Sequence, residues 1–256
     1  HCSGLKSVGD SFLKPLEYWD VNFSGTINLL KVMEKYFCNN LVFSSSATIY
    51  ASDTSSPIKE SAKIEPINPY GKTKAAVEEI LDDFYYAKKD KLSIACLRYF
   101  NPIGAHSSGI LGEQPNGKPT NIFPLISKVA CNEIDELKIF GNDWETSDGT
   151  GVRDYVHIMD LAEGHERMLD YLFKNNSSNI KLNIGTGKGT SVLELIKKFE
   201  SVNNVKVPFS FVQRRKGDKG IVYADNSYAK KLLNWEPKRT IEQMCIDGWK
   251  WKKKFL

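Results

Sequence analysis

The chain has 256 residues, of which 41% are hydrophobic and 26% are charged, and its formal net charge at pH 7 is +4. This composition is typical of a globular protein with a sizeable core. Its five cysteines form no CxxC pair and no apolar run reaches the ~18–20 residues of a membrane span, so we expect no disulfide framework, no metal site and no membrane partner. The basic cluster at 250–254 is short and no secretory signal is evident, so we expect a cytoplasmic protein that binds no nucleic acid.

The first half of the chain predicts alternating helices and strands. Apolar residues at helical spacing indicate one long helix from near Pro15 to Phe37, with Gly25 inside it. A glycine within a helix costs up to about 1 kcal/mol relative to alanine, so either a cofactor or another backbone lies close to Gly25, or the glycine is simply tolerated. The elements that follow are a strand from 41, a loop at 52–67, a helix at 70–86, and a strand at 92–100 that Asn101-Pro102 stops. This order predicts an α/β fold on a doubly wound parallel sheet.

The second half is richer in loops. A soft boundary gives units of 1–102 and 103–256, and part of 154–186 is expected to pack back on the first unit. Asp160 is a candidate for a helix cap, and Ser191 is a second one, in a Ser-x-x-Glu capping box. The expected helices cover 122–131, 158–174, 191–201, 227–233 and 241–251, and the expected strands cover 137–140, 181–184 and 207–212.

A glycine-rich segment, GTGKG at 185–189, lies between a predicted strand and a predicted helix. Its spacing is GxGxG instead of the GxGxxG of dinucleotide-binding loops, and no acidic residue ends a second strand about 20 residues later. We therefore interpret the segment as a tight turn, with a phosphate-binding loop as the alternative.

Ser46, Tyr70 and Lys74 suit proton transfer. Tyr70 and Lys74 share one face of the predicted helix, with Cβ atoms about 6 Å apart. A tyrosine has an ordinary pKa of about 10, and bringing it near 7 requires roughly 4 kcal/mol of phenolate stabilisation, much of which a nearby ammonium can supply. Ser46 ends a predicted parallel strand, where ligands bind in open α/β sheets. These groups can move a proton off an alcohol while a hydride leaves its carbon, although YxxxK also occurs by chance.

The segments around these residues resemble a known family. It is the UDP-glucose 4-epimerases (UDP-galactose 4-epimerases) of the extended short-chain dehydrogenase/reductase superfamily, which the chain resembles in HCSGLKSVGDS, SSSATIY, NPYGKTK, LRYFNPIGAH, FGNDWETSDGTGVRDYVHIMDLAEGH and RRKGD. The resemblance implies a Rossmann-like NAD-binding domain, incomplete at its N-terminus, in 1–102 and a smaller UDP-sugar-binding domain in 103–256. It also implies that tightly held NAD accepts a hydride from C4 of the sugar, and that the 4-keto sugar turns about its diphosphate before the hydride returns.

The resemblance further implies roles for individual residues. Tyr70 is the base that takes the 4-OH proton, Lys74 tunes it and binds the nicotinamide ribose, and Ser46 assists at the same oxygen. These three contact the cofactor together with Lys6, Tyr99 and Phe100. Besides Ser46 and Tyr70, the positions that match UDP-sugar contacts are Asn101, Asn121, Ile122, Lys138, Ile139, Phe140, Arg153, Arg215, Asp218 and Val222.

Arg153 has a simpler alternative. An arginine is suited to forked phosphate contacts, but a surface ion pair with the adjacent Asp154 would also explain it.

Two features depart from the family pattern. The glycine-rich phosphate loop and the acidic residue that binds the ribose would lie before His1, so at least the ~30 residues of a first βαβ unit are expected to be missing. Val222 stands where some family members have tyrosine and others a small residue. A small residue there would leave room beside the C2 substituent, so N-acetylated UDP-sugars are also expected substrates.

Other interpretations stay open. A nucleotide-sugar dehydratase needs an Asp-Glu pair beside the strand serine or threonine, where this chain has Ala47-Thr48, so elimination is disfavoured. A non-catalytic fragment or binding module is the interpretation that an absent phosphate loop favours. The resemblance implies a homodimer formed by the helices at 15–37 and 71–86. His106, His157 and His165 have neither ligand spacing nor a nucleophile partner, and we take them as structural or solvent-facing.

Overall fold

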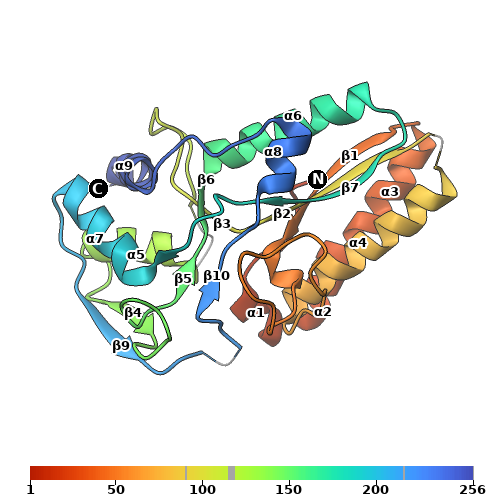
Figure 1. Ribbon diagram of the computed structural model, residues 1–256. Coiled ribbons are helices and arrows are strands. Elements are labelled where there is room, and N and C mark those ends of the chain that lie inside the picture. The colour runs from red at the N-terminus through yellow and green to blue at the C-terminus, as the bar shows by residue number, and fades with distance from the viewer. Residues whose placement is uncertain (90, 115–118, 216, 256) are drawn as a thin grey trace.

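In the computed structural model, which describes residues 1–89, 91–114, 119–215 and 217–255, three parallel strands form a central sheet. Helices α3 (Gly25–Lys35) and α4 (Pro69–Ala87) cover one face, and α6 (Ile158–Lys174) with α8 (Ser227–Leu233) covers the other, as Figure 1 shows. Helices on both faces of a parallel sheet confirm the predicted α/β architecture. In spatial order, the strands are β1 (Asn40–Ser46), β2 (Ser93–Tyr99) and β7 (Asn179–Ile184).

Alternation of side chains along β1 explains the two layers of core. Leu41 and Phe43 pack with α3 and α4, whereas Val42 packs with α6. A strand that is buried on both faces reads as a continuous apolar run, which is why the sequence showed no alternation here. β7 comes late in the chain yet pairs with β2 on the far side from β1, so 179–184 belongs to the first sheet.

The long helix predicted from Pro15 is interrupted by a π-helical segment. α2 (Pro15–Tyr18) continues into η1 (Trp19–Ser24) and then into α3, and a short additional helix, α1 (Val8–Leu13), precedes them. A Cβ atom at Gly25 would meet only the carbonyl oxygen of Asp20, at 3.9 Å. The structure therefore shows no tight approach of another backbone to Gly25 among the described residues.

The buried amide of Asn22 explains the position of the π-helical segment. Its Oδ1 accepts from the backbone N–H of Leu5 at 2.7 Å, and its Nδ2 donates to the Thr73 hydroxyl of α4 at 3.2 Å. π-helical turns often occur where a side chain has a particular task, and here that side chain joins the start of the chain to α4.

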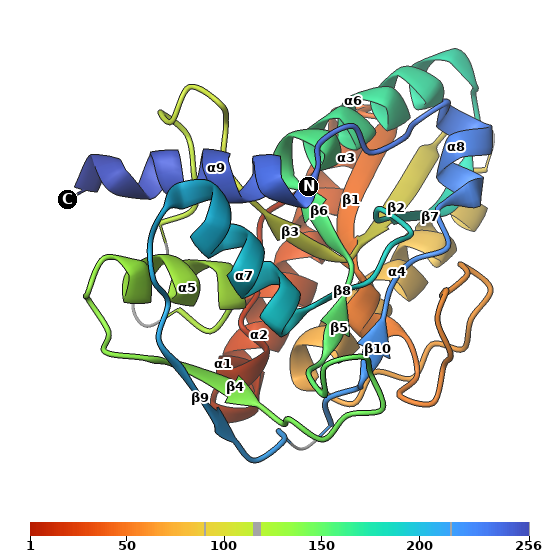
Figure 2. The ribbon, with the colours of Figure 1, turned by 60° about the vertical axis from the view of Figure 1, so that its left-hand side comes forward.

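The other half of the molecule, whose helices and short strands Figure 2 shows, is built around a second apolar cluster. Phe199 lies at its centre and makes edge-to-face contacts with Phe123 and Trp249. The helices around it are α5 (Ile122–Ala130), α7 (Val192–Asn203) and α9 (Ile241–Lys252), which extends into the 3₁₀ turn η3 (Lys253–Phe255). The short strands, none longer than four residues, are β3 (Asn101–Ile103), β4 (Leu137–Phe140), β5 (Val152–Arg153), β6 (Tyr155–His157), β8 (Thr190–Ser191), β9 (Phe209–Val212) and β10 (Ile221–Val222).

Three local predictions have clear outcomes. The strand predicted at 92–100 does stop before Asn101-Pro102, since β2 ends at Tyr99, but a new strand, β3, begins at Asn101 and pairs with β6. The cap of α6 is His157, whose Nδ1 accepts from the Met159 N–H at 3.0 Å, and Asp160 lies inside the first turn. Ser191 does cap α7, as predicted, by accepting from the Glu194 N–H at 3.0 Å.

The glycine-rich segment at 185–189 is a tight turn, as predicted. The backbone N–H groups of Thr186 and Gly187 donate to the Asp154 carboxylate at 2.7 and 3.0 Å. A phosphate would need those same N–H groups, and the buried carboxylate already occupies them. None of the helices in the described ranges is long and apolar enough to cross a membrane.

Candidate active site

The turn after β1 and the first turn of α4 bring Ser46 and Tyr70 together. The hydroxyl of Ser46 accepts from the backbone N–H of Thr48 at 3.2 Å, which shapes the 3₁₀ turn η2 (Ala47–Ile49). Asn68 caps α4 by accepting from the Gly71 N–H at 2.7 Å. A Cβ atom at Gly71 would lie only 2.7 Å from the Thr48 carbonyl oxygen, so only glycine allows this approach.

Burial dominates the electrostatics of Tyr70. It raises the pKa of the phenol well above its ordinary value, with a further contribution from Tyr99, while a hydrogen bond from Ser46 opposes the increase. The lowering expected from the Lys74 spacing is therefore not produced by the protein's own groups, because desolvation outweighs the favourable contacts of the phenolate.

Lys74 is buried with its ammonium close to the end of β1. Its Nζ donates to the Ser44 carbonyl oxygen at 2.9 Å and lies 4.7 Å from the centre of the Phe43 ring and 5.8 Å from that of Tyr70. Burial lowers the pKa of Lys74 to about 8, since few partners replace the water that the charged form loses. The helical i, i+4 spacing does place the ammonium beside Tyr70, as predicted.

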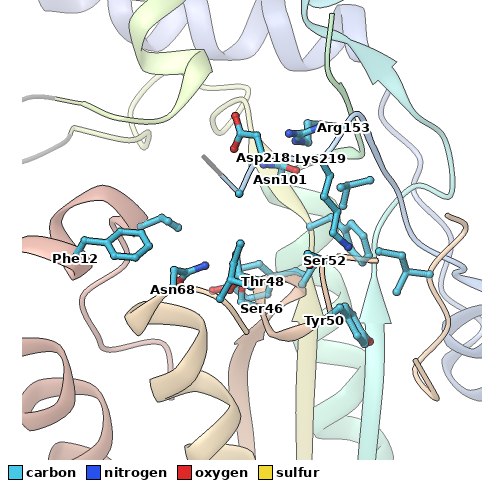
Figure 3. Close-up of a pocket in the computed structure, with 18 residues that line it drawn as sticks. Phe12, Ser46, Thr48, Tyr50, Ser52, Asn68, Asn101, Arg153, Asp218 and Lys219 are labelled. Atoms are coloured by element: carbon cyan, nitrogen blue, oxygen red, sulfur yellow. The ribbon is translucent and has the colours of Figure 1, made fainter. Parts of the chain in front are cut away.

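A cavity of about 240 Å³ opens at the carboxyl ends of β1 and β2. Figure 3 shows Ser46 and Thr48 on one side of it and Arg153 on the opposite side. Its position agrees with the rule that ligands bind outside the carboxyl ends of parallel strands. The predicted site residues that line it are Ser46, Tyr99, Phe100, Asn101, Arg153, Asp218 and Val222.

Arg153 faces this cavity and forms no ion pair with Asp154. Its Nη1 donates to the carbonyl oxygens of Val152 and Gly220, at 2.9 and 3.5 Å. The Asp154 carboxylate instead accepts hydrogen bonds from the turn at 186–187 and from the Ala224 N–H. The surface ion pair that the sequence left open is therefore wrong.

Several other predicted site residues lie outside the cavity. Arg215 stacks on the Phe140 ring, with its guanidinium carbon 3.7 Å from the ring centre, and Ile139 is buried in the second apolar cluster. Tyr70 and Lys74 do not line the cavity either, since both are buried beside Ser46. The remaining ones are Lys6, which is exposed and paired with Glu113, Lys138, which is paired with Glu136 and bonded to Ser210, Asn121, which precedes α5, and the partly buried Ile122.

The sequence did not point to some residues that line the cavity. The Thr48 hydroxyl donates to Ser46 Oγ at 3.0 Å, and its only signal was its position two residues after the serine. Lys219 follows Asp218 and donates to the Ala51 carbonyl oxygen at 2.5 Å, and burial lowers the pKa of its ammonium. Other such residues are Val8, Phe12, Tyr50, Ser52, Ile58, Ile67 and Asn68.

The three histidines differ in their surroundings. His106 bonds to Ser108 in a surface loop, and His157 is buried against Asp247 at 3.2 Å. His165 is closer to the site, since its Nε2 lies 3.1 Å from the Ser44 hydroxyl. Among the residues whose placement is described, no three metal-binding side chains form a cluster.

Comparison with known proteins identifies the family. Residues 1–247 match a family model described as GDP-mannose 4,6 dehydratase. The chain is 48% identical over 252 residues to the UDP-glucose 4-epimerase of Bacillus subtilis (strain 168), covering 98% of this chain and 74% of that protein. It is 49% identical over 255 residues to the UDP-glucose 4-epimerase of Pasteurella multocida (strain Pm70), covering 99% of this chain and 75% of that protein.

Solved structures agree. A UDP-glucose 4-epimerase from Stenotrophomonas maltophila, with bound NAD and formylated UDP-arabinopyranose, matches with a TM-score of 0.95 and 46% identity over 99% of this chain and 75% of that one. The enzyme from Bifidobacterium longum, in complex with NAD+ and UDP, matches with a TM-score of 0.93 and 44% identity, over 98% of this chain and 75% of that one. The chain therefore belongs to the UDP-glucose 4-epimerases, isomerases of the extended short-chain dehydrogenase/reductase superfamily.

Proposed function

We propose that this chain catalyses the NAD-dependent interconversion of UDP-glucose and UDP-galactose at C4, through a 4-keto sugar. The observation that carries the proposal is the meeting of Ser46, Tyr70 and Lys74 at the carboxyl ends of parallel strands, beside a cavity that Arg153 faces. Related structures that hold NAD together with UDP or a UDP-sugar support it.

The residues beside the cavity fit a nicotinamide cofactor. The Lys74 ammonium has three N–H donors and uses one on the Ser44 carbonyl oxygen, so two can serve ribose hydroxyls. Tyr99 and Phe100 line the same cavity and would lie beside the nicotinamide ring, whereas Lys6 lies apart from it. When bound, NAD supplies the acceptor for the C4 hydride and a positive charge that favours the tyrosine phenolate.

Tyr70 would accept the proton of the sugar 4-OH. Burial keeps its pKa high, so the phenolate depends on nearby positive charge, and Lys74 is the protein's contribution. The Ser46 hydroxyl already accepts two hydrogen bonds from Thr48, which leaves its own O–H to donate toward Tyr70 or the substrate oxygen. A proton can then pass between O4 and Tyr70 in either direction.

The far side of the cavity would hold the nucleotide end of the substrate. Arg153 has only two carbonyl contacts, and its planar guanidinium suits a diphosphate. Asp218 lines the same side and would accept from ribose hydroxyls. Arg215, three residues before it in the chain, stacks on Phe140 outside the cavity. Holding this end while the hexose is held loosely would allow the keto sugar to turn.

Val222 supports a broader substrate range. It lines the cavity, and its strand position pairs with that of Arg153. A valine there takes much less space than a tyrosine, so we propose that N-acetylated UDP-sugars are also accepted.

We also propose a homodimer in the cytoplasm. Several large apolar side chains are exposed on or beside α3 and at the end of α4, among them Val32, Tyr36, Phe37 and Tyr86, and Phe37 is 84% exposed. A second copy of the chain, packing through the same helices, would cover them, and sedimentation equilibrium would measure it.

Elimination is the second candidate reaction, and the description of the matching family model favours it. It needs an acid and a base that the position beside Ser46 lacks, because Ala47 stands there. A binding module without catalysis is the third candidate.

One product analysis separates the three. UDP-galactose is incubated with the protein and NAD in deuterated water, and the products are separated by chromatography and identified by mass spectrometry. Epimerisation through an internally returned hydride yields UDP-glucose without deuterium at C4. A 4-keto-6-deoxy sugar would show elimination, and unchanged substrate would show that the chain only binds, so either result refutes the proposal.

A further inference from the structure

A buried polar network lies directly beside the candidate active site. Glu78 of α4 and Arg98 of β2 form an ion pair with each side chain 3% exposed, and Arg98 Nη2 lies 2.6 Å from Glu78 Oε2. Arg98 Nε donates to both carboxylate oxygens, at 3.0 and 3.2 Å. The hydroxyl of Ser45, on β1, donates to Glu78 Oε1 at 2.5 Å. One carboxylate therefore joins α4, β1 and β2.

On the strand side, the network adjoins the site residue by residue. Ser45 precedes Ser46 on β1, and Arg98 precedes Tyr99 on β2. The register pairs Ser45 with Arg98, and Ser46 with Tyr99. A shift of either network residue would therefore move a residue that lines the cavity.

On the helix side, the network shares a face with the proposed base. Glu78 lies one turn after Lys74 and two turns after Tyr70, and residues at this spacing project from the same side of a helix. The distance between the Tyr70 hydroxyl and Ser46 thus depends on how α4 packs against β1. The Glu78 carboxylate is hydrogen-bonded to both β1 and β2 at this contact.

The network also reaches the wall of the cavity. Arg98 Nη1 donates to the Tyr50 hydroxyl at 3.2 Å and to the Glu60 carbonyl oxygen at 2.8 Å. The Tyr50 hydroxyl in turn donates to Asn183 Oδ1 of β7 at 2.6 Å, and its ring lines the cavity. A network whose buried members are all bonded is rigid, because any movement leaves a polar group without a partner.

We propose that Glu78, Arg98 and Ser45 are positioning residues, which hold α4 against β1 and β2 so that the Tyr70 hydroxyl stays within reach of Ser46 and of the substrate oxygen. None of the three lines the cavity, so they would act through Tyr70 and Ser46. The inference rests on the proposed epimerase function. A buried ion pair by itself is weak evidence for a role in stability, because apolar side chains of similar size often stabilise a protein equally well. Apolar side chains could not, however, hold α4, β1 and β2 in one fixed geometry through hydrogen bonds.

The molecule contains a matched control on the same helix. Asp82, one turn beyond Glu78, pairs with Lys181 of β7 at 2.7 Å and so also ties α4 to the sheet, but away from the site. The Asp82 pair is more exposed than the Glu78 pair, so its loss should cost less stability. A merely structural role predicts that kcat in each variant falls only as far as the loss of stability explains. A positioning role predicts that only the Glu78 network affects the reaction.

The test compares Ser45→Ala, Glu78→Gln and Asp82→Asn in the chain supplied with NAD. Steady-state kinetics with UDP-galactose are measured across pH, together with thermal unfolding. We expect kcat to fall about tenfold in Ser45→Ala and about 100-fold in Glu78→Gln, with KM within about threefold, because small misplacements of a reacting group cost this much. The acidic limb of the kcat profile should move to higher pH, since a weakened Ser46 hydrogen bond no longer favours the Tyr70 phenolate. Asp82→Asn should change neither.

The readouts separate failure of this inference from failure of the proposed function. Ser45→Ala keeps the ion pair intact, so it decides the question even if Glu78→Gln does not fold. If the wild type epimerises UDP-galactose and Ser45→Ala has the same kcat and pH profile, the positioning role is overturned and the proposed function stands. If the wild type produces no UDP-glucose, the proposed function fails, and hydrogen exchange of the backbone amides in the first turns of α4 still tests positioning. Faster exchange there in Ser45→Ala than in Asp82→Asn supports the role, and equal exchange in the two variants overturns it.

Discussion

The two walls of the cavity are built in different ways. The first wall holds Ser46, with Tyr70 and Lys74 buried directly beside it, and it comes from a seven-residue strand and a 19-residue helix that pack into one apolar cluster next to a buried polar network. The wall with Arg153 and Val222 comes from two-residue strands that meet across about 70 positions of sequence. A group that transfers protons must be held to fractions of an ångström, whereas groups that bind a substrate can sit on shorter and more adaptable segments.

Removing the proposed base is the strongest way to test the first wall. In Tyr70→Phe the ring stays and only the hydroxyl is lost, so we expect kcat to fall about 1,000-fold with KM for UDP-galactose within about threefold. Initial rates at several pH values measure both constants. Tyr228→Phe, at an exposed position of α8, is the control and should match the wild type. A Tyr70→Phe rate within tenfold of the wild type would mean that another group takes the proton.

The second prediction concerns the stability of the same wall. The pKa of Lys74 is lowered from 10.5 to about 8, so the unfolded chain holds more protons between these values and the free energy of unfolding contributed by Lys74 rises with pH across that window. At pH 7 its burial therefore opposes folding by about 3 kcal/mol, at 1.36 kcal/mol for each pKa unit. We expect Lys74→Met to be more stable than the wild type at pH 7, although inactive.

Urea unfolding of both proteins at pH 7 and pH 10 measures this effect. The stability difference should shrink at pH 10, where the wild-type lysine is largely neutral in the folded state. A variant that is less stable than the wild type at pH 7 would show that the ammonium contacts outweigh its desolvation.

The third prediction concerns the second wall. Replacing Arg153 with methionine removes a charged hydrogen-bond donor from the substrate, which is typically worth about 1.5–3 kcal/mol. We expect KM for UDP-galactose to rise about 10- to 100-fold, while kcat stays within about threefold. Arg214→Met is a suitable control, because Arg214 pairs with Asp143 and stacks on Trp144 outside the cavity. A large fall in kcat at unchanged KM would place Arg153 in the chemical step instead.

The smallest expected effect is on substrate choice. Val222→Tyr should narrow the cavity, so we expect the ratio of kcat/KM for UDP-N-acetylgalactosamine to that for UDP-galactose to fall about tenfold, the usual scale of steric selection in a pocket. Competition between the two substrates, followed by chromatography, measures the ratio directly. An unchanged ratio would rule out Val222 as the gate.

Local sequence rules accounted for the first wall and for most of the regular elements. The helix at 158–174 has the predicted bounds, and the strands at 41 and 92 and the helix at 70 were predicted within a few residues. Their apolar residues repeat with a clear period, and the first turn of α4 carries Asn68 and Pro69, which begin a helix by local hydrogen bonding and backbone geometry.

The short strands β3, β5, β6, β8 and β10 were not predicted. Two or three residues carry no periodicity, and these strands form only because distant segments supply their hydrogen bonds. The same limit explains why Lys219 was missed and why the choice between a phosphate ligand and an ion pair with Asp154 stayed open for Arg153.

By itself, then, the sequence determined the α/β layering and the helical face shared by Tyr70 and Lys74, because both depend on spacing within one element. Only the tertiary structure decided that Asn22 joins the start of the chain to α4, that Asp154 occupies the glycine-rich turn, and that Glu78 binds Arg98 and Ser45. It also decided the sign of the change in the pKa of Tyr70, since desolvation depends on everything that packs around a side chain and cannot be read from its neighbours in sequence.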